Sequence, residues 1–462
     1  MTGVKDRIAA SRHQRHMVRY LPELAARAVP RYTSYPTAAE FNDDVGAAEQ
    51  AAALAAIGAD DAVSLYVHIP YCREICWYCG CTTGAVGRPD RLATYVDALV
   101  DEIDAVASRM AGRVTAIHLG GGSPNALAAE DMTRLMAALR DRFTVADDVE
   151  IAVELDPRTL DADYCALLGG LGVTRASLGV QTFAPAIQRR INRVQPYWTA
   201  AEAVRDLRYA GVRHINFDLL YGLPGQRNDD VADTIAASLR LHPERIAMFG
   251  YAHMPRLLPR QRMIDAADLP GVEARLEQSA IARSMLTSAG YRAIGFDHFA
   301  VPTDSLALAA AEGRLHRNFQ GFTDEAVRAV IGLGASAISQ YDGLLVQNEK
   351  HVGRYRGRTR TGLVGVRGVL RSAEARLRGA VIERLLCDGR VDVAAIARSM
   401  AMSPEPLLPA FDALGALVAI GVVTADGWCV ALAPWAWPYA RIAAAAFDSY
   451  RTAGERRFSR AV

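Results

Sequence analysis

The run His68-Ile69-Pro70-Tyr71-Cys72-Arg73-Glu74-Ile75-Cys76-Trp77-Tyr78-Cys79-Gly80-Cys81 decides the fold, because it places a cysteine loop directly after a predicted strand at 64–70. It gathers four of the seven cysteines into ten positions. The other three, Cys165, Cys387 and Cys429, are scattered. An odd, uneven set is a poor disulfide framework, so the tight cluster indicates metal or redox chemistry in a reducing compartment.

The spacing Cys72-x3-Cys76-x2-Cys79 favours an iron–sulfur cluster over zinc. Structural zinc sites use sets that complete four ligands, and no second pair follows here at such a spacing. Cys81 lies only two residues past Cys79, so a fourth ligand from it would be strained. Three thiolates on one loop leave one iron of a 4Fe–4S cluster open to a small molecule, whereas electron-transfer clusters are closed by four cysteines. The alternatives to an iron–sulfur cluster are a structural zinc site and a group of buried free cysteines.

Outward from this loop, short apolar runs of the buried-strand type recur with helical patterns between most of them. The runs are 64–70, 115–122, 151–157, 175–180, 214–220, 245–251 and 291–299. Such alternation, at a period of roughly 30 residues, predicts βαβ units. Six or seven units predict an α/β fold with a parallel sheet curled into a full or partial barrel, and a doubly wound open sheet is the competitor. In either fold, ligands bind at the carboxyl ends of the strands.

The pattern differs outside residues 61–360. Residues 1–60 are mixed and polar and are predicted to be an N-terminal extension. Beyond 360, residues 376–387 and 391–400 have helical patterns, and Asp426-Gly427 predicts a hairpin turn within 422–432. We therefore expect a small, mostly helical, winged-helix-like domain over 361–462, with a packing or lid role.

Charge and hydropathy indicate a protein without nucleic-acid or membrane partners. The formal net charge is +1, which gives no general attraction to polyanions. The N-terminus has no apolar core of the signal-peptide kind. The most apolar late stretch, 411–423, is interrupted by Asp412 and is too short to span a bilayer. A cytoplasmic location is the expectation.

Further candidate site residues follow the predicted strands. Gly120-Gly121-Gly122-Ser123-Pro124 comes after the second strand, where glycines let the backbone approach a ligand, although a simple tight turn is the alternative. The spacing matches neither GxGxxG nor a P-loop. Polar residues at one end of a barrel favour a ligand pocket, and a satisfied ion pair is the alternative for each alone. They are Glu154, Asp156, Gln181, Arg193, Asp218, Tyr251 and His253.

The cysteine motif resembles that of the radical S-adenosylmethionine (SAM) superfamily, and the whole chain resembles the oxygen-independent coproporphyrinogen III oxidase family. Four segments carry the narrower resemblance: Arg31-Tyr32-Thr33-Ser34-Tyr35-Pro36-Thr37; Tyr66-Val67-His68-Ile69-Pro70 with the cysteine motif; Gly222-Leu223-Pro224 after Asp218; and His316-Arg317-Asn318-Phe319-Gln320-Gly321. Phe458-Ser459-Arg460 is similar to that family's C-terminus. The resemblance implies a partial (β/α)6-type barrel.

The resemblance also implies roles for individual residues. Cys72, Cys76 and Cys79 hold the 4Fe–4S cluster, and two SAM molecules bind beside it. Contacts to the first SAM come from Tyr66, Gly121, Gly122, Glu154, Ala252 and Ile338. Contacts to the second come from Tyr78, Gln181, Arg193 and Asp218, with Gly122 and Ser123 near both. The implied catalytic residues are Tyr66, His68, Glu154, Phe319 and Gln320.

The implied reaction begins when a 5′-deoxyadenosyl radical takes a β-hydrogen from a propionate side chain. Loss of carbon dioxide and one electron leaves a vinyl group, and two rounds convert coproporphyrinogen III to protoporphyrinogen IX in haem synthesis. A flavodoxin or ferredoxin is the expected electron donor, and a monomer the expected state. Arg31, Arg193 and Arg317 are candidate partners for propionates, because guanidinium binds carboxylate bidentately.

The chain departs from the family in places. Ser123 replaces the usual threonine but keeps the hydroxyl group. The stretch Thr323-Asp324-Glu325-Ala326-Val327-Arg328-Ala329 differs from the family's Thr-Thr-x-x-Asp pattern, which concerns the substrate end of the pocket. The alternatives are a related methyl- or methylene-transferring radical SAM enzyme, or a haem-binding chaperone. Chaperone relatives often lack the Arg31–Thr37 segment and the Cys-Gly-Cys ending, and both are present here.

Overall fold

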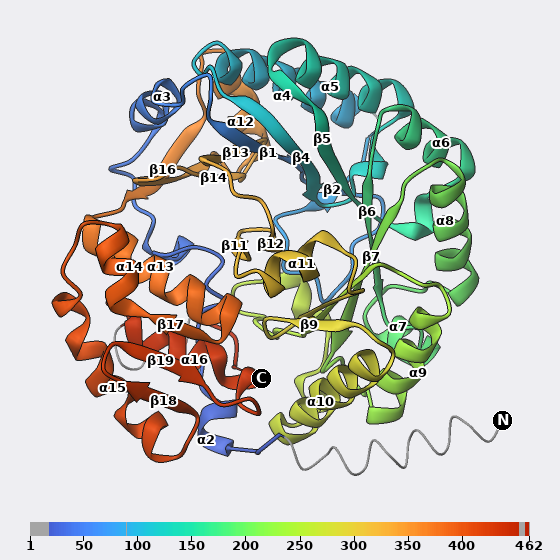
Figure 1. The fold of residues 1–462 in the computed structure, drawn as a ribbon. Coiled ribbons are helices and arrows are strands. Elements are labelled where there is room, and N and C mark those ends of the chain that lie inside the picture. Colours follow the sequence, from blue (N-terminus) through green and yellow to red (C-terminus); the bar gives the residue numbers. More distant parts are fainter. Residues whose placement is uncertain (1–17, 89, 452–457, 462) are drawn as a thin grey trace.

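The computed structural model describes residues 18–88, 90–451 and 458–461, and a curved parallel sheet lies at its centre (Figure 1). The strands β1 (Ala62–Ile69), β4 (Arg113–Gly121), β5 (Thr144–Leu155), β6 (Arg175–Gln181), β7 (His214–Tyr221) and β8 (Arg245–Gly250) follow one another in chain order. Each neighbouring pair is parallel. A doubly wound sheet reverses its strand order, and this one does not, so the predicted partial barrel is confirmed.

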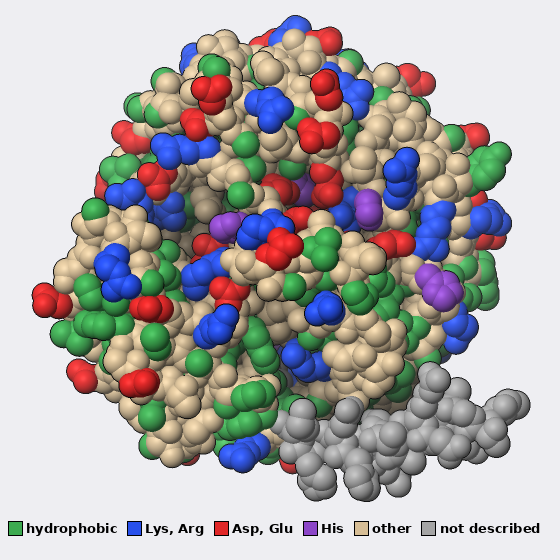
Figure 2. Space-filling view, in the orientation of Figure 1, with side chains coloured by type: hydrophobic (Ala, Val, Ile, Leu, Met, Phe, Trp, Pro, Cys, Tyr) green, Lys and Arg blue, Asp and Glu red, His purple; other side chains and the backbone are tan. Residues whose placement is uncertain are grey.

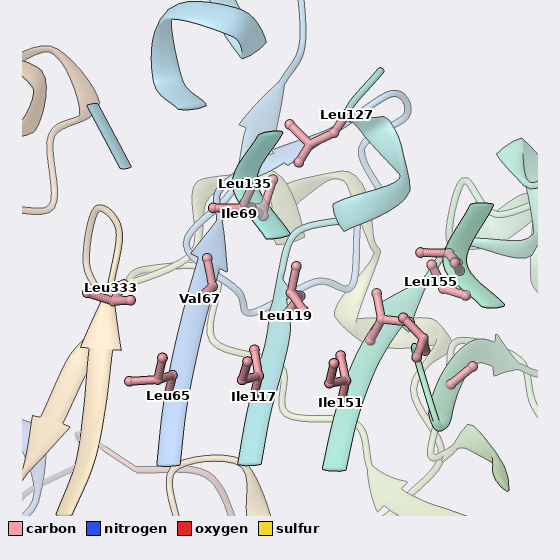
Figure 3. Packing of buried hydrophobic residues seen from close by; sticks show 14 of the residues in the cluster. Leu65, Val67, Ile69, Ile117, Leu119, Leu127, Leu135, Ile151, Leu155 and Leu333 are labelled. Atoms are coloured by element: carbon pink, nitrogen blue, oxygen red, sulfur yellow. The ribbon is translucent and has the colours of Figure 1, made fainter. Parts of the chain in front are cut away.

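The connecting helices cover the outer face of this sheet (Figure 1). They are α4 (Asp90–Ala107), α5 (Ala129–Arg142), α6 (Ala162–Gly170), α8 (Tyr197–Tyr209), α9 (Asn228–Leu239) and α10 (Val272–Ser288). Figure 3 shows Leu65, Val67 and Ile69 of β1 beside Ile117 and Leu119 of β4 in the buried apolar layer. Because side chains alternate along a strand, the intervening residues of each strand face the interior of the barrel.

The sheet continues on both sides without closing. Beyond β1 it adds β13 (Ala329–Leu333), β14 (Ile338–Gln340), β15 (Leu344–Asn348) and β16 (Gly365–Leu370), and beyond β8 it adds β10 (His298–Ala300) and β9 (Arg292–Ile294). The expectation of one strand over 291–299 is wrong. Gly295, at φ +57°, turns the chain there and leaves two short antiparallel strands.

The C-terminal part is mostly helical. Its elements are α13 (Ala373–Asp388), β17 (Arg390–Asp392), α14 (Val393–Ser399), α15 (Leu408–Ala419), β18 (Val423–Asp426), β19 (Cys429–Leu432) and α16 (Ala440–Ala444). The predicted helix at 376–387 and the hairpin at Asp426-Gly427 are confirmed. The helix expected from 391 starts later, because Val391 pairs with Val430 in β17 and Asp392 accepts the Ala395 N–H as the cap of α14.

The described part of the N-terminal extension lies in two places. The α3 helix (Ala47–Ala55) packs beside β15 and β16, whereas α2 (Pro22–Ala25) lies against the C-terminal elements (Figure 1). The Val29 N–H donates to the Ser459 carbonyl at 3.0 Å, and the Tyr32 hydroxyl donates to Asp448 at 2.9 Å. The limits 1–60, 61–360 and 361–462 stay a prediction, and residues 1–17 lie outside the described residues.

No helix in the described ranges combines the length and the apolar character that a membrane crossing requires.

A buried carboxyl group on α4 links the barrel to the segment after β13. Glu102 accepts hydrogen bonds from the Tyr355 hydroxyl at 2.5 Å, the Gly334 N–H at 2.6 Å and the Asn348 amide at 2.7 Å. Burial raises the pKa of Glu102 from 4.5 to about 7, and these three donors limit the rise.

Glu102→Gln is therefore expected to change how stability depends on pH. The pKa is higher in the folded state, so this group's stabilising contribution is complete below pH 4.5 and is lost as the pH rises through 7. The loss is at most about 3 kcal/mol, and the glutamine variant does not show it. Urea midpoints at pH 5 and pH 8 measure the difference. Glu130→Gln, at an exposed carboxylate on α5, is the control, and equal pH dependence of Glu102→Gln and wild type would contradict the prediction.

Candidate active site

The cysteine loop after β1 forms one wall of a pocket at the carboxyl ends of the strands. The space inside it, with its open mouth, is about 770 Å³, within the usual range for ligand sites. The predicted residues that line it are Cys72, Cys76, Tyr78, Cys79, Gly121, Gly122, Ser123, Glu154, Gln181, Arg193 and Asp218. We call it the cysteine pocket. In Figure 2, basic, acidic and histidine side chains border the hollowed middle of the displayed face.

The glycine run allows the second strand to pack closely against the cysteine loop. The Gly122 N–H donates to the Ile69 carbonyl, and the Ser123 N–H donates to the Tyr71 carbonyl, both at 2.8 Å. A β-carbon at Gly122 would lie 2.4 Å from that Tyr71 oxygen, and one at Gly121, whose φ is +103°, would lie 2.4 Å from the His68 ring. Any side chain at these two positions would displace the loop.

Hydrogen-bond donors surround two of the three predicted ligand sulfurs, Cys72 and Cys79. The Ser123 hydroxyl donates to Cys72 Sγ at 3.6 Å, and the Thr83 hydroxyl lies 3.2 Å from the same atom. The Cys81 N–H donates to Cys79 Sγ at 3.4 Å. Hydrogen bonding from Cys81 lowers the pKa of Cys79 to about 6, whereas burial raises the pKa of Cys72.

Two guanidinium groups flank the third sulfur, Cys76 Sγ. Arg193 donates to it at 3.4 Å and Arg158 at 3.6 Å. Both arginines pair with Asp156, at 3.2 and 2.6 Å respectively. Burial acts to raise the pKa of Asp156, but Arg193 and Arg158 hold it below its ordinary value. Because Arg193 also donates to the Gly179 carbonyl, its guanidinium is occupied, which argues against a direct role in propionate binding.

Two acidic side chains of the inward face meet beside the cysteines. Glu154 on β5 accepts the Gly121 N–H at 3.1 Å. Burial and the nearby Asp218 raise the pKa of Glu154 to about 7. Asp218 on β7 accepts hydrogen bonds from Ser177 at 2.9 Å and Asn216 at 3.0 Å, and burial raises its pKa. The pocket thus offers two hydrogen-bonding acids next to the cysteine sulfurs.

Tyr66 and His68 hold the far end of the cysteine loop. His68 Nε2 lies 3.0 Å from the Thr82 carbonyl oxygen, which can only accept, so this nitrogen carries the proton. His68 Nδ1 then accepts the Tyr66 hydroxyl at 3.1 Å. Burial lowers the pKa of His68 and keeps the ring neutral. This geometry makes His68 a residue that positions the loop.

Besides Tyr66 and His68, four predicted site residues do not line the cysteine pocket. The Ala252 carbonyl accepts from Gln261 Nε2 at 3.0 Å, and the same nitrogen donates to the Tyr78 carbonyl at 2.8 Å. Phe319 and Ile338 pack against a small apolar cluster around Phe41, Leu345 and Val369. Gln320 lies in the turn between β11 (His316–Asn318) and β12 (Gly321–Thr323), with its amide nitrogen buried and without a partner among the described residues.

Arg158 and Gln261 were missed by the sequence reasoning. Arg158 follows Asp156-Pro157 after the third strand. Its positive charge two residues from the candidate acid Asp156 could have marked it as a site residue. Gln261 lies in an irregular segment between β8 and α10, and no local pattern marks it.

The divergent segment enters the barrel interior. Glu325 accepts a hydrogen bond from His118 Nε2 at 2.5 Å, and His118 lies on β4 with its side chain inward. Burial acts to lower the pKa of His118, but Glu325 raises it above its ordinary value. The divergent segment thus places an ion pair inside the barrel, and His118 of this pair acts electrostatically on the carboxyl group of Glu154.

Known proteins resemble this chain over nearly all of its length. Residues 66–237 match the model of the radical SAM superfamily. The chain is 44% identical to the oxygen-independent coproporphyrinogen III oxidase of Bradyrhizobium diazoefficiens over 94% of this chain and 97% of that protein. It is 40% identical to the enzyme of the same name from Cereibacter sphaeroides over 92% and 95%.

A solved structure also matches. It is coproporphyrinogen III oxidase (HemN) from Escherichia coli, described as a radical SAM enzyme. The TM-score is 0.87 at 34% identity, over 92% of this chain and 100% of that one.

Proposed function

Because this chain belongs to the oxygen-independent coproporphyrinogen III oxidase family of the radical SAM superfamily, we propose that it converts coproporphyrinogen III to protoporphyrinogen IX. Two propionate side chains become vinyl groups. Each conversion removes one hydrogen atom and one electron from the side chain and releases carbon dioxide. The enzyme is an oxidoreductase of porphyrin and haem biosynthesis.

The observation that carries the proposal is the shared pocket. Cys72, Cys76 and Cys79 come from one loop, and hydrogen-bond donors reach all three sulfurs. Anionic cluster thiolates are stabilised by such donors, so this sulfur set fits a 4Fe–4S cluster. Within the described ranges, no three His, Cys, Asp or Glu side chains are close enough together to hold one metal ion. A 4Fe–4S cluster does not need such a group, because it binds each cysteine through a different iron.

When bound, the cluster and SAM supply the electron and the 5′-deoxyadenosyl radical that removes the propionate hydrogen. The residues of the chain bind and orient the cluster, SAM and the substrate, and they exclude water. Gly121 and Gly122 bring backbone close to the cysteine loop, and Glu154 and Asp218 offer acceptors beside it. Tyr66 and His68 fix the loop through Thr82.

The number of SAM molecules is part of the proposal, and we expect two per chain. The first is assigned to Tyr66, Gly121, Gly122, Glu154, Ala252 and Ile338. The second is assigned to Tyr78, Gln181, Arg193 and Asp218. Most of these residues line the cysteine pocket, which supports the assignment. Phe319 and Gln320 are proposed as catalytic residues on the turn that follows β11.

Asp218→Ala is expected to lower SAM binding from two molecules per chain to one. Its side chain is held inward by Ser177 and Asn216, so its loss removes an acceptor from the second site. Equilibrium dialysis of the anaerobic, cluster-loaded protein counts the bound molecules. Asp229→Ala on α9 is the control, and a wild-type count of one would contradict the two-site proposal.

The cellular setting is proposed from the chemistry. A low-potential flavodoxin or ferredoxin supplies the electron, and the protein works as a monomer in the cytoplasm. All seven cysteines are in the described part of the chain, and all are free thiols, which suits a reducing compartment.

The function is tested by anaerobic incubation of the reconstituted protein with SAM, a reductant and coproporphyrinogen III. Carbon dioxide, 5′-deoxyadenosine and a product with two vinyl groups are expected. A methylated or methylene-bridged product would instead identify a group-transferring relative. Haem binding without SAM cleavage would identify a chaperone. Either result overturns the proposal.

A further inference from the structure

We propose that a second pocket, lined by arginines, binds carboxylate groups of the substrate while another propionate reacts in the cysteine pocket. It lies where the ends of β7 and β8 meet the N-terminal and C-terminal segments, and its space is about 550 Å³ including the mouth. Arg31, Arg275, Arg441 and Arg460 line it, and we call it the arginine pocket. The inference rests on the proposed function, because it takes coproporphyrinogen III as the ligand.

The charge of this pocket is unbalanced. Asp297 is the one acidic residue in its lining, against four arginines. That carboxylate is already engaged, since it accepts a hydrogen bond from His298 Nδ1 at 2.6 Å. Burial acts to raise the pKa of Asp297, but His298 and then Arg317 and Arg31 hold it below its ordinary value. A single engaged carboxylate does not neutralise both Arg31 and Arg441.

Two of the arginines, Arg31 and Arg441, are held by backbone carbonyls, which fix their position without cancelling their charge. Arg31 donates to the Gly250 carbonyl at 3.1 Å. Arg441 donates to the Arg460 carbonyl at 2.9 Å and the Ala461 carbonyl at 2.6 Å. Among the described residues, Arg31 and Arg441 form no ion pair with a carboxylate. Burial and then the charge of Arg31 lower the pKa of Arg441 to about 10, so it stays protonated at neutral pH.

A fifth guanidinium lies behind the pocket. Arg317 is 8% exposed and donates to the Arg31 carbonyl at 3.3 Å. Its Nε and Nη1 atoms are buried without a hydrogen-bond partner in the described chain. The guanidinium lies 4.9 Å from the ring centre of Phe296, a residue of the pocket lining, and 4.4 Å from that of Phe322. Buried guanidinium atoms without partners are costly, and a nearby anion offsets that cost.

The position of the arginine pocket suits a substrate that spans two sites. Tyr221 ends β7 and Gly250 ends β8, so the pocket lies on the same rim of the barrel as the cysteine pocket. The pair Asp297–His298 links the two, because Asp297 lines the arginine pocket and His298 acts electrostatically on Asp218 in the cysteine pocket. A macrocycle lying across this rim can present one propionate to each pocket.

The ligand chemistry follows from these groups. Guanidinium recognises carboxylate in a planar, two-bond geometry. Coproporphyrinogen III carries four propionates, of which only one reacts at a time, so the others need fixed partners. The Tyr221 and Tyr251 rings in the lining provide the apolar surface that a propionate's methylene groups contact.

The test uses coproporphyrin III, the air-stable oxidised form with the same four propionates, in a fluorescence titration of the cluster-loaded protein. Arg31→Gln is the first variant, because Arg31 is exposed and its loss removes one hydrogen bond to a carbonyl. Arg275→Gln is the second. Each is expected to bind coproporphyrin III about 10- to 100-fold more weakly. Arg205→Leu, at the exposed Arg205 of α8, is the control.

The deciding quantity is the affinity for coproporphyrin III relative to the affinity for SAM, measured on each variant. A tenfold or greater fall in this ratio, with a shallower dependence of binding on salt, supports the inference. The inference is overturned if a variant keeps the wild-type ratio. This holds whether both affinities stay as in wild type or the affinities for coproporphyrin III and SAM fall together. If wild type itself neither binds coproporphyrin III nor converts the porphyrinogen, the proposed function fails. Conversion by wild type with an unchanged ratio defeats this inference alone.

Discussion

Replacement of Cys76 by serine is expected to abolish both the cluster and the turnover of coproporphyrinogen III. Cys76 is buried between Arg158 and Arg193, whose guanidinium groups point at its sulfur. A serine hydroxyl is a poor iron ligand and leaves the cluster held by two cysteines of one loop. Bound iron is expected to fall from about four atoms per chain to almost none. Iron and sulfide analysis after anaerobic reconstitution measures the loss.

Two further cysteine variants make this result specific. Cys429→Ser lies on β19, exposed and far along the chain, and is expected to keep full iron content. Cys81→Ser is the sharper comparison, because Cys81 lines the same pocket and hydrogen-bonds to Cys79 but is not one of the three assigned ligands. It should also keep about four irons. A Cys76→Ser protein with a complete cluster, or a Cys81→Ser protein without one, would refute the three-cysteine assignment.

Replacement of Asp156 by alanine is expected to destabilise the fold by about 3–5 kcal/mol, the usual cost of removing one partner from a buried ion pair. The side chains of Asp156, Arg158 and Arg193 are almost completely buried, and the carboxylate lies between the two arginines. Without it, Arg193 loses its carboxylate partner, and Arg158 keeps only the exposed Glu74 at 2.7 Å. The free energy of unfolding, from urea denaturation at pH 7, measures the effect.

The matched control is Asp97→Ala. Its carboxylate pairs with Arg134 at 2.6 Å, the same distance as Asp156 to Arg158, but both side chains are about half exposed. Exposed pairs contribute only about 0.2–1 kcal/mol, so this variant should differ little from wild type. Equal losses in the two variants would show that burial of the Asp156 pair has no special cost. Wild-type stability should also fall as the pH drops through the lowered pKa of Asp156, because the folded carboxylate then takes up a proton.

Much of the site was predictable because strand geometry is regular. Once a strand is located, alternation fixes which residues face inward, and this places Tyr66, Glu154 and Asp218 on the inner face of the barrel. The cysteine spacing was equally readable, since three ligands within eight positions require no tertiary information.

The residues that were missed depend on contacts between distant parts of the chain. Arg158 reaches Cys76 across 82 positions, and Gln261 reaches the Tyr78 carbonyl across 183. No local pattern encodes either contact. The strand expected at 291–299 failed for a different reason: its apolar residues fit a strand, but Gly295 adopts a backbone angle that breaks it. Phe319 and Gln320 were identified by resemblance alone, and their side chains lie outside the cysteine pocket.

The pairing of residues 27–28 with residues 460–461 has a consequence for how the protein folds during translation. Ala28 pairs with Arg460 across the molecule, and the Ala461 N–H donates to the Arg27 carbonyl at 2.8 Å. Every strand of the barrel leaves the ribosome well before residue 460 does. A nascent chain can therefore assemble its metal-binding half while the docking place for the macrocycle is still unfinished. A translation product released before residue 459 should load iron normally and yet bind coproporphyrin III more weakly.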